Sequence, residues 1–143
     1  MTPILVPFQP CHIDNYRPGV VERLSFNRER AKAACGAWEN AVSVVHKGEV
    51  IGMSAAFIRG KMATVSMFLS DEIRRHPIFL HRTVRRGMKM LKDSGVETIV
   101  VTCDARLRSA VAWLDRLGFK KTGKTVEHNG IDYMRYECQA RNF

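Results

Sequence analysis

One amphipathic segment between two β-rich segments most constrains the fold of this chain. Pro77 is a favourable first residue of a helix, and Gly95 suits the end of one. The apolar residues that share one face of this predicted helix are Ile78, Leu80, Val84, Met88 and Leu91. The segment 97–103 that follows is rich in β-branched residues, which favour a buried strand. Because a strand after such a helix usually lies parallel to the strand before it, the sequence predicts a βαβ crossover.

An antiparallel meander of three strands is predicted before the crossover, at 41–46, 50–58 and 62–70. The tight turn Lys47-Gly48 and the short segment 59–61 separate these strands. Connections this short force neighbouring strands to run antiparallel. A further strand is predicted at 4–8, at the edge of the sheet, because an edge strand tolerates the missing N–H of Pro7.

The remaining segments complete a mixed α/β pattern. One or two helices are predicted between 14 and 41, with an interruption near Pro18-Gly19. A helix at 106–118 ends at Gly118, and strands at 119–125 and 131–138 form a hairpin across Asn129-Gly130. The predicted fold is a mixed, mostly antiparallel sheet with a central parallel crossover, flanked by helices. A chain of 143 residues fits one domain spanning 1–143.

The charge of the chain is concentrated on the central helix. The sequence has 23 Lys and Arg residues against 14 Asp and Glu, a net charge of +9, which favours anionic partners. Basic residues recur at helical spacing opposite the apolar face; they are Arg82, Arg85, Arg86, Lys89 and Lys92. This basic ridge is either a solvated face or a surface that binds phosphate groups or an acidic protein. Nucleic acid is the weaker option, because no helix-turn-helix, zinc finger or stacking platform accompanies the charge.

Cysteine spacing and hydropathy exclude several other classes of protein. The four cysteines form no C-x-x-C pair and no Cys/His cluster at zinc spacing, so no metal site is predicted. Pro3, Pro7 and Pro10 break the start of the chain, so no signal peptide is expected. No apolar run is long enough to span a membrane. The sequence therefore predicts a cytoplasmic protein with reduced thiols and no membrane association.

The order of predicted elements and two segments resemble a known superfamily. The segment 110–119, Ala-Val-Ala-Trp-Leu-Asp-Arg-Leu-Gly-Phe, resembles a helix that runs into a Leu-Gly-Phe strand entry. The segment 69–79 falls where that superfamily has a strand-to-helix loop, and Arg74 matches the first position of the loop motif. The superfamily is that of the Gcn5-related N-acetyltransferases (GNAT). The resemblance covers nearly the whole chain and implies an N-acyltransferase that uses acetyl-CoA or another acyl-CoA.

The resemblance also implies where acyl-CoA would bind. In the family, the loop wraps the pyrophosphate with backbone N–H groups at a helix N-terminus. The two glycine positions of the motif are Pro77, which has no N–H, and Phe79, whose ring we expect where the cofactor would lie. The residues implied at the pantetheine-phosphate end are Arg74, Arg75, His76, Ile78 and Phe79. The backbone of Phe68, Leu69 and Ser70 would hold the pantetheine arm and supply a donor to the thioester carbonyl.

Two residues are candidates for catalysis. Asp104 follows the predicted strand 97–103, where ligand-contacting groups gather in α/β sheets, and it either acts as a base or caps the next helix. His76 either contacts phosphate and titrates near neutral pH or is a solvated loop residue. The family often has a tyrosine that protonates the CoA thiolate, and the matching position here is Leu114.

A closer resemblance is to small GNAT-like proteins of short-tailed bacteriophages, of the internal virion protein A type. It lies in Met67–Asp71, in the basic helix and in Arg108–Leu114. The resemblance implies a phage protein in the host cytoplasm or the virion. Two functions stay open: an acyl-CoA-dependent N-acyltransferase with an altered cofactor loop, or a non-catalytic module that binds a host protein or virion component through the basic ridge.

Overall fold

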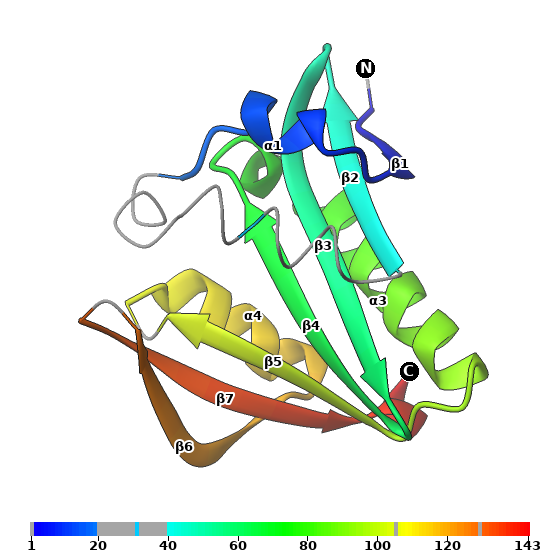
Figure 1. Ribbon diagram of the computed structural model, residues 1–143, viewed down its shortest axis with the longest axis vertical. Helices are drawn as coiled ribbons and strands as arrows, with labels where there is room; N and C mark the ends of the chain where they lie inside the picture. The colour runs from blue at the N-terminus through cyan, green and yellow to red at the C-terminus, as the bar shows by residue number, and fades with distance from the viewer. Residues whose placement is uncertain (1, 20–30, 32–39, 105, 129) are drawn as a thin grey trace. The chain divides into compact units, whose positions relative to one another are not determined.

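The computed structural model describes residues 2–19, 31, 40–104, 106–128 and 130–143 (Figure 1). Its strands are β1 (Ile4–Pro7), β2 (Asn40–His46), β3 (Glu49–Arg59), β4 (Met62–Leu69), β5 (Thr98–Asp104), β6 (Lys120–His128) and β7 (Ile131–Gln139). Its helices are α1 (Cys11–Asn15), α3 (Pro77–Asp93) and α4 (Arg108–Leu117), with short 3₁₀ turns η2 (Ile73–Arg75) and η3 (Ala140–Asn142). Each predicted strand is present, and its ends lie within three residues of those predicted.

The seven strands form one sheet in the order β1-β2-β3-β4-β5-β7-β6. The predicted crossover is confirmed, because β4 and β5, which flank α3 in the chain, pair in parallel from Met62–Thr98 to Val65–Val101. The sheet is otherwise mostly antiparallel, as in the pairs β1–β2, β2–β3, β5–β7 and β6–β7. The predicted fold class is therefore confirmed. The pairing of β4 with β5 covers the first four residues of each strand, and both strands continue beyond it.

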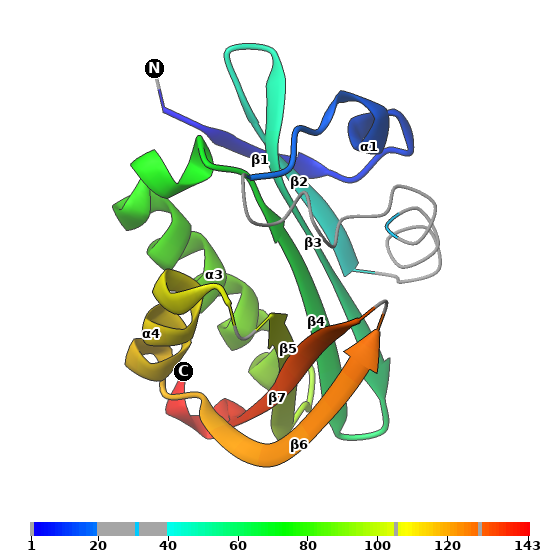
Figure 2. The same ribbon diagram turned by 90° about the vertical axis from the view of Figure 1, so that its left-hand side faces the viewer.

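Turn chemistry accounts for the antiparallel connections. Lys47 and Gly48 both adopt positive φ, of 52° and 76°, as a two-residue hairpin turn of type I′ requires. In the β6–β7 hairpin, the register shifts between Lys121 and Thr125, and Gly123 has a φ of 81° within this bulge. Figure 2 shows the strong curve of β6. At the other edge of the sheet, β1 pairs with β2 alone among the described strands, which suits Pro7.

The helix α3 begins at Pro77 and ends before Gly95, as predicted. Gly95 has a φ of 101°, and the N–H of Val96 donates a hydrogen bond to the carbonyl of Leu91, which closes the last turn. The prediction that Ile78 lies on the buried face is wrong, since its side chain is 70% exposed. Phe79 and Leu80 pack against the core in its place, so the apolar face begins one residue later than the sequence pattern indicated.

The helix α4 begins at Arg108, two residues after the predicted start. The N–H of Leu107 donates to the carbonyl of Asp104, so the chain completes a turn before the helix starts. The helix ends at Gly118, whose φ of 96° confirms the predicted cap. Leu114 and Leu117 are buried, as the apolar face of this helix predicted.

The chain forms two compact units, one from 1–57 and 66–82 and the other from 58–65 and 83–143. The described residues of the first unit include two apolar clusters. One contains Ile13, Tyr16, Ala31, Val50 and Met53, and the other contains Val44, Ile51 and Ile73 with Leu69, Phe79 and Leu80 packed against it. The largest buried side chains of the second unit include Ile99 and Phe119. The prediction of one domain spanning 1–143 remains a prediction.

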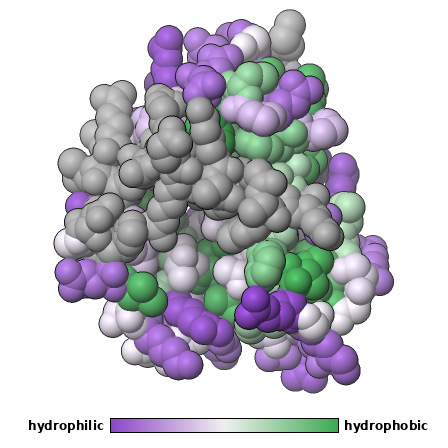
Figure 3. All heavy atoms as spheres, in the orientation of Figure 1, coloured by the Kyte–Doolittle hydropathy of each residue, from purple (hydrophilic) through white to green (hydrophobic). Residues whose placement is uncertain are grey.

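The prediction of helices between 14 and 41 falls largely outside the described residues. Within them, α1 begins earlier, at Cys11, and the chain is extended at Tyr16. Asn129 of the predicted turn also lies outside them, whereas Gly130 has the expected positive φ of 77°. Figure 3 shows apolar side chains on the side of β1 and β2, where Ile4 and Leu5 are exposed. No helix in the described part of the chain has both the length and the hydropathy to cross a membrane.

Candidate functional site

The loop between β4 and α3 is anchored to β3 by Ser70 and Ile73. The N–H and the hydroxyl of Ser70 both donate to the carbonyl of Ile51, at 3.1 and 2.6 Å. The side chain of Ile73 is 1% exposed and packs against Val44 and Ile51. The predicted role of the Ser70 N–H as a donor to a thioester would therefore require this hydrogen bond to break.

The first turn of α3 presents backbone donors despite the missing glycines. The first hydrogen bond of the helix runs from the N–H of Leu80 to the carbonyl of His76, at 3.0 Å. The N–H groups of Ile78 and Phe79 therefore precede the first N–H of the helix that has an acceptor within it. Pro77 has no N–H to leave unpaired. These two N–H groups and the positive end of the helix dipole favour an anion.

The structure places the side chain of Phe79 against the core of the first unit. It is partly buried and packs against the cluster of Val44, Ile51 and Ile73 in the first unit. The physical reason is that Phe79 falls on the buried side of the first turn, while Ile78 takes the exposed side. The ring therefore contributes to the core, and the prediction that it lies where the cofactor would bind stays a prediction.

The two predicted arginines of the loop, Arg74 and Arg75, lie two to three residues before the first residue of α3. Arg75 is exposed, and its guanidinium forms an ion pair with Oε2 of Glu72 at 3.1 Å. Arg74 is half-buried. Glu72 was not among the predicted site residues, and its charge partly offsets that of the two arginines.

Two histidines and Glu72 meet at the start of this loop. His46 lies at the end of β2 and is buried, whereas Glu72 and His76 are half-buried. Oε1 of Glu72 lies 3.9 Å from Nδ1 of His46 and 3.7 Å from Nε2 of His76. The two imidazole rings meet edge to face, with centroids 4.8 Å apart. Of this cluster, only His76 was predicted as a site residue from the sequence. The spacing of four between Glu72 and His76 was a usable signal, but no local pattern points to His46.

Asp104 is buried at the end of β5 and is held by Arg106. The guanidinium of Arg106 donates to both carboxylate oxygens, with Nη2 2.6 Å from Oδ2 and Nε 3.0 Å from Oδ1. The N–H of Arg106 also donates to Oδ1 at 3.0 Å. These hydrogen bonds hold the pKa of Asp104 below its usual value, although burial acts in the opposite direction. The arrangement favours a structural role in the turn before α4, because a carboxylate with both oxygens engaged is a weak base. Asp104 does not cap α4 itself, whose N-cap residue is Leu107.

We expect Arg106→Ala to reduce the pH dependence of stability. Because the pKa of Asp104 is lower in the folded chain than its ordinary 3.8, the ion pair stabilises the fold above that pH. This contribution is lost as the pH falls through the folded pKa. The variant should therefore be less stable than the parent at pH 7, and the difference should shrink below about pH 4. Urea denaturation at pH 3, 5 and 7 measures this difference.

A matched control is Lys61→Ala, which breaks the ion pair of Lys61 with Glu97 at 3.4 Å. Both side chains of that pair are largely exposed, so its loss should change stability little at any of the three pH values. Equal effects of the two substitutions at every pH would contradict the role given to Asp104.

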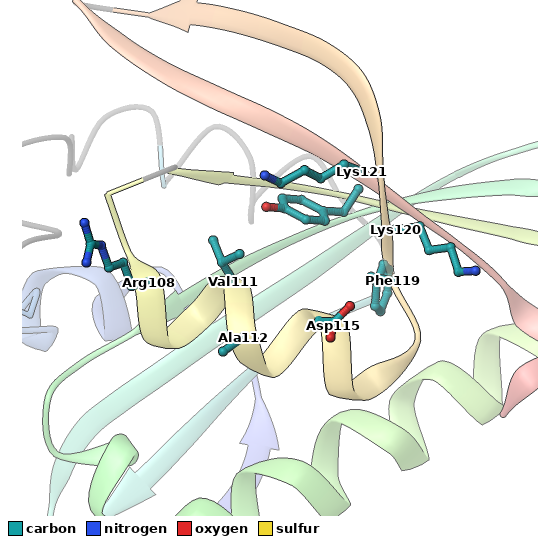
Figure 4. Close-up of a pocket in the computed structure, with 8 residues that line it drawn as sticks. Arg108, Val111, Ala112, Asp115, Phe119, Lys120 and Lys121 are labelled. Atoms are coloured by element: carbon teal, nitrogen blue, oxygen red, sulfur yellow. The ribbon is translucent and has the colours of Figure 1, made fainter.

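A pocket of about 550 Å³ lies in the second unit, between α4 and the strands β6 and β7 (Figure 4). Its lining residues are Arg108, Val111, Ala112, Asp115, Phe119, Lys120, Lys121 and Tyr136. Burial raises the pKa of the Tyr136 phenol, and its hydroxyl has no hydrogen-bond partner among the described residues. None of the predicted site residues lines this pocket.

The basic ridge on α3 is exposed along its whole length. Two of its members interact with Phe143. The guanidinium of Arg85 lies 5.8 Å from the centre of the Phe143 ring, and Nζ of Lys92 donates to the main-chain oxygen of Phe143 at 2.6 Å. Arg82, Arg86 and Lys89 form no ion pair with any carboxylate in the described part of the chain. These three side chains are therefore the part of the ridge that is available to a partner.

Comparison with known proteins identifies the fold. No protein-family model matches the chain, and no curated protein matches it in sequence. Among solved structures, Ard1 from Thermoplasma volcanium superposes with a TM-score of 0.79 at 11% identity, over 97% of this chain and 98% of that one. The ribosomal-protein-S18-alanine N-acetyltransferase from Escherichia coli gives a TM-score of 0.73 at 10% identity, over 97% and 94% of the two chains. An acetyltransferase of the GNAT family from Bacillus anthracis gives 0.71 at 11% identity, over 97% and 95%. The chain therefore has the fold of the GNAT N-acetyltransferases.

Proposed function

We propose that this protein is an N-acyltransferase that takes its acyl group from acetyl-CoA or another acyl-CoA. The observation that supports the proposal most is that, in a chain of this fold, the first turn of α3 offers donors for a phosphate group. The turn presents the N–H groups of Ile78 and Phe79, and Arg74 and Arg75 directly precede it in the chain. This combination suits a phosphate group, because orphan amides, the helix dipole and two guanidinium groups all favour an anion.

The residues present fit an acyl-CoA with fewer donors than a glycine loop would supply. Arg74 and Arg75 would balance the charge of the phosphates, while Ile78 and Phe79 would donate backbone hydrogen bonds. The exposed side chain of Ile78 offers an apolar contact beside them. The backbone of Phe68 and Leu69 stays the predicted support for the pantetheine arm. A bound acyl-CoA would supply a thioester: the amine would form an amide bond with the acyl carbon as the C–S bond breaks, and CoA would leave as its thiol after the proton lost by the amine is passed to the sulfur.

The two predicted catalytic residues receive different roles in this proposal. Asp104 would have to leave Arg106 before it could accept a proton from an amine, so we assign it to the turn between β5 and α4. His76 lies immediately before the first turn of α3, so we assign it to the end of the site that receives phosphate. Neither residue is therefore assigned as the base that accepts a proton from the amine.

Calorimetric titration with acetyl-CoA and with CoA tests the proposal. We expect micromolar binding of both ligands, because the phosphate end is common to them. Arg74→Ala should weaken binding at least tenfold, since a charge-assisted hydrogen bond contributes about 1.5–3 kcal/mol and 1.4 kcal/mol corresponds to tenfold. A matched control is Arg59→Ala, which removes an equal charge from the exposed end of β3 and should leave binding unchanged.

The absence of heat with millimolar ligand and a folded protein would reject the proposal and leave the second candidate function. This candidate is a non-catalytic module of GNAT fold that binds an acidic protein through Arg82, Arg86 and Lys89. The burial of Leu114, at the position where the family often has a proton-donating tyrosine, favours it. The predicted phage origin is common to both candidates, and a host protein or virion component as the partner belongs to this one.

A further inference from the structure

We propose that His46, Glu72 and His76 form a binding site for a divalent transition metal ion, and that Zn²⁺ fits it best. His46 comes from the end of β2, whereas Glu72 and His76 lie four residues apart just before α3, and the three side chains meet within the first unit. Their ligand atoms, one from each residue, all lie within 4.8 Å of one another. The site shares His76 with the phosphate end of the proposed acyl-CoA site, but it does not require that acyl-CoA binds.

The donor set is one that zinc prefers. Two imidazole nitrogens and one carboxylate oxygen provide three protein ligands and leave a fourth position for water or an anion, as zinc sites with an open position do. Imidazole also selects for zinc over magnesium or calcium, which favour sites made of oxygen atoms alone. None of the three ligands is a cysteine, so cysteine spacing could not have indicated this site.

The distances leave room for an ion if the three side chains move closer together. At metal–ligand bonds of about 2.0–2.1 Å, the atoms of a tetrahedral site lie about 3.3–3.4 Å apart. Oε1 of Glu72 lies 3.9 Å from Nδ1 of His46 and 3.7 Å from Nε2 of His76, so these two gaps must close by roughly half an ångström. The third gap, between the two imidazole nitrogens, is at most 4.8 Å and must close by up to about 1.4 Å. Glu72 and His76 are half-buried and can move, while His46 is buried in its place at the end of β2.

The surroundings hold Glu72 in a suitable orientation. Arg75 engages the other carboxylate oxygen, Oε2, at 3.1 Å, so Oε1 remains directed at both imidazoles. Such outer contacts orient the ligands of metal sites. The buried side chain of Ile73, next to Glu72 in the chain, anchors the same loop to β3. A metal ion here would therefore tie the end of β2 to the residue that precedes α3, and would fix the loop that leads into the first turn of the helix.

The test is calorimetric titration of untagged, chelator-treated protein with Zn²⁺, supported by the visible absorption of Co²⁺ in its place. We expect one equivalent to bind, and the intense visible bands of four-coordinate Co²⁺ to develop in parallel. His76→Gln and Glu72→Gln should each weaken Zn²⁺ binding by at least tenfold, because a lost ligand costs no less than a lost outer contact. Zinc should also raise the midpoint of thermal unfolding of the parent and not of these variants.

Control variants separate this site from adventitious binding. His81→Gln removes a histidine from the same helix region outside the cluster and should leave the affinity for Zn²⁺ unchanged. His46→Gln changes a buried side chain, so its folding is checked by circular dichroism, and the half-buried His76 and Glu72 carry the test if it unfolds. Absence of binding, or equal binding by the parent, His76→Gln and Glu72→Gln, would overturn the proposal. Since CoA is titrated separately, failure here leaves the proposed acyltransferase function untouched.

Discussion

Replacing Ile73 with alanine is expected to lower the free energy of unfolding by about 2–5 kcal/mol. Ile73 is 1% exposed and packs with Val44 and Ile51, so its truncation leaves a cavity in the first unit. The neighbouring backbone cannot collapse freely into that cavity, because Ser70 bonds twice to the carbonyl of Ile51. The substitution should also weaken acyl-CoA binding, since Ile73 anchors the loop that carries Arg74 and Arg75.

Equilibrium denaturation in urea measures this loss, and Ile78→Ala is the matched control. The same atoms are removed five residues along the chain, but the Ile78 side chain is 70% exposed, so the cost should stay within about 0.5 kcal/mol. A cost for Ile73→Ala as small as that of the control would contradict the packing of the loop on β3. If stability falls and acyl-CoA binding does not, the loop is not the part of the chain that receives phosphate.

Local sequence signals were sufficient to predict the architecture. The Lys47-Gly48 turn, the glycines at 95 and 118 and the β-branched run after α3 each act over a few residues, and all were confirmed. The ends of elements were less predictable where tertiary contacts decide them. The start of α4 moved from 106 to Arg108 because the side chain of Asp104 binds Arg106, which no periodicity reveals.

The orientation of side chains at the candidate site could not be predicted from periodicity alone. Ile78 and Phe79 are adjacent apolar residues, and either could have been the buried one. The cluster of Val44, Ile51 and Ile73 takes up Phe79, which leaves Ile78 exposed and the first turn of α3 open. Long-range proximity was equally inaccessible, since His46 meets Glu72 and His76 only through the fold. The loop proposed to bind acyl-CoA was therefore predicted from its resemblance to a family motif, whereas the cluster proposed to bind a metal ion emerged only from the geometry of the fold.

Introducing a tyrosine at position 114 is expected to destabilise the protein. Leu114 is 2% exposed in the second unit, and its carbonyl accepts hydrogen bonds from the N–H groups of Gly118 and Phe119 at the end of α4. This end of the helix cannot shift to admit a larger side chain without losing those bonds. Overpacking costs about 1–3 kcal/mol, and a buried hydroxyl without a partner adds about 1–3 kcal/mol. Urea denaturation of Leu114→Tyr should therefore show a loss of several kcal/mol.

The control for this substitution is Leu114→Met, which nearly conserves volume and should cost less than about 1.5 kcal/mol. The comparison bears on function because the matching position in many GNAT enzymes holds a tyrosine that protonates the CoA thiolate. If Leu114→Tyr is as stable as the parent, position 114 has room for a phenol, as expected if it faced a catalytic site. If it is destabilised as expected, residue 114 belongs to the core, and any acyl transfer by this protein must supply that proton from another group.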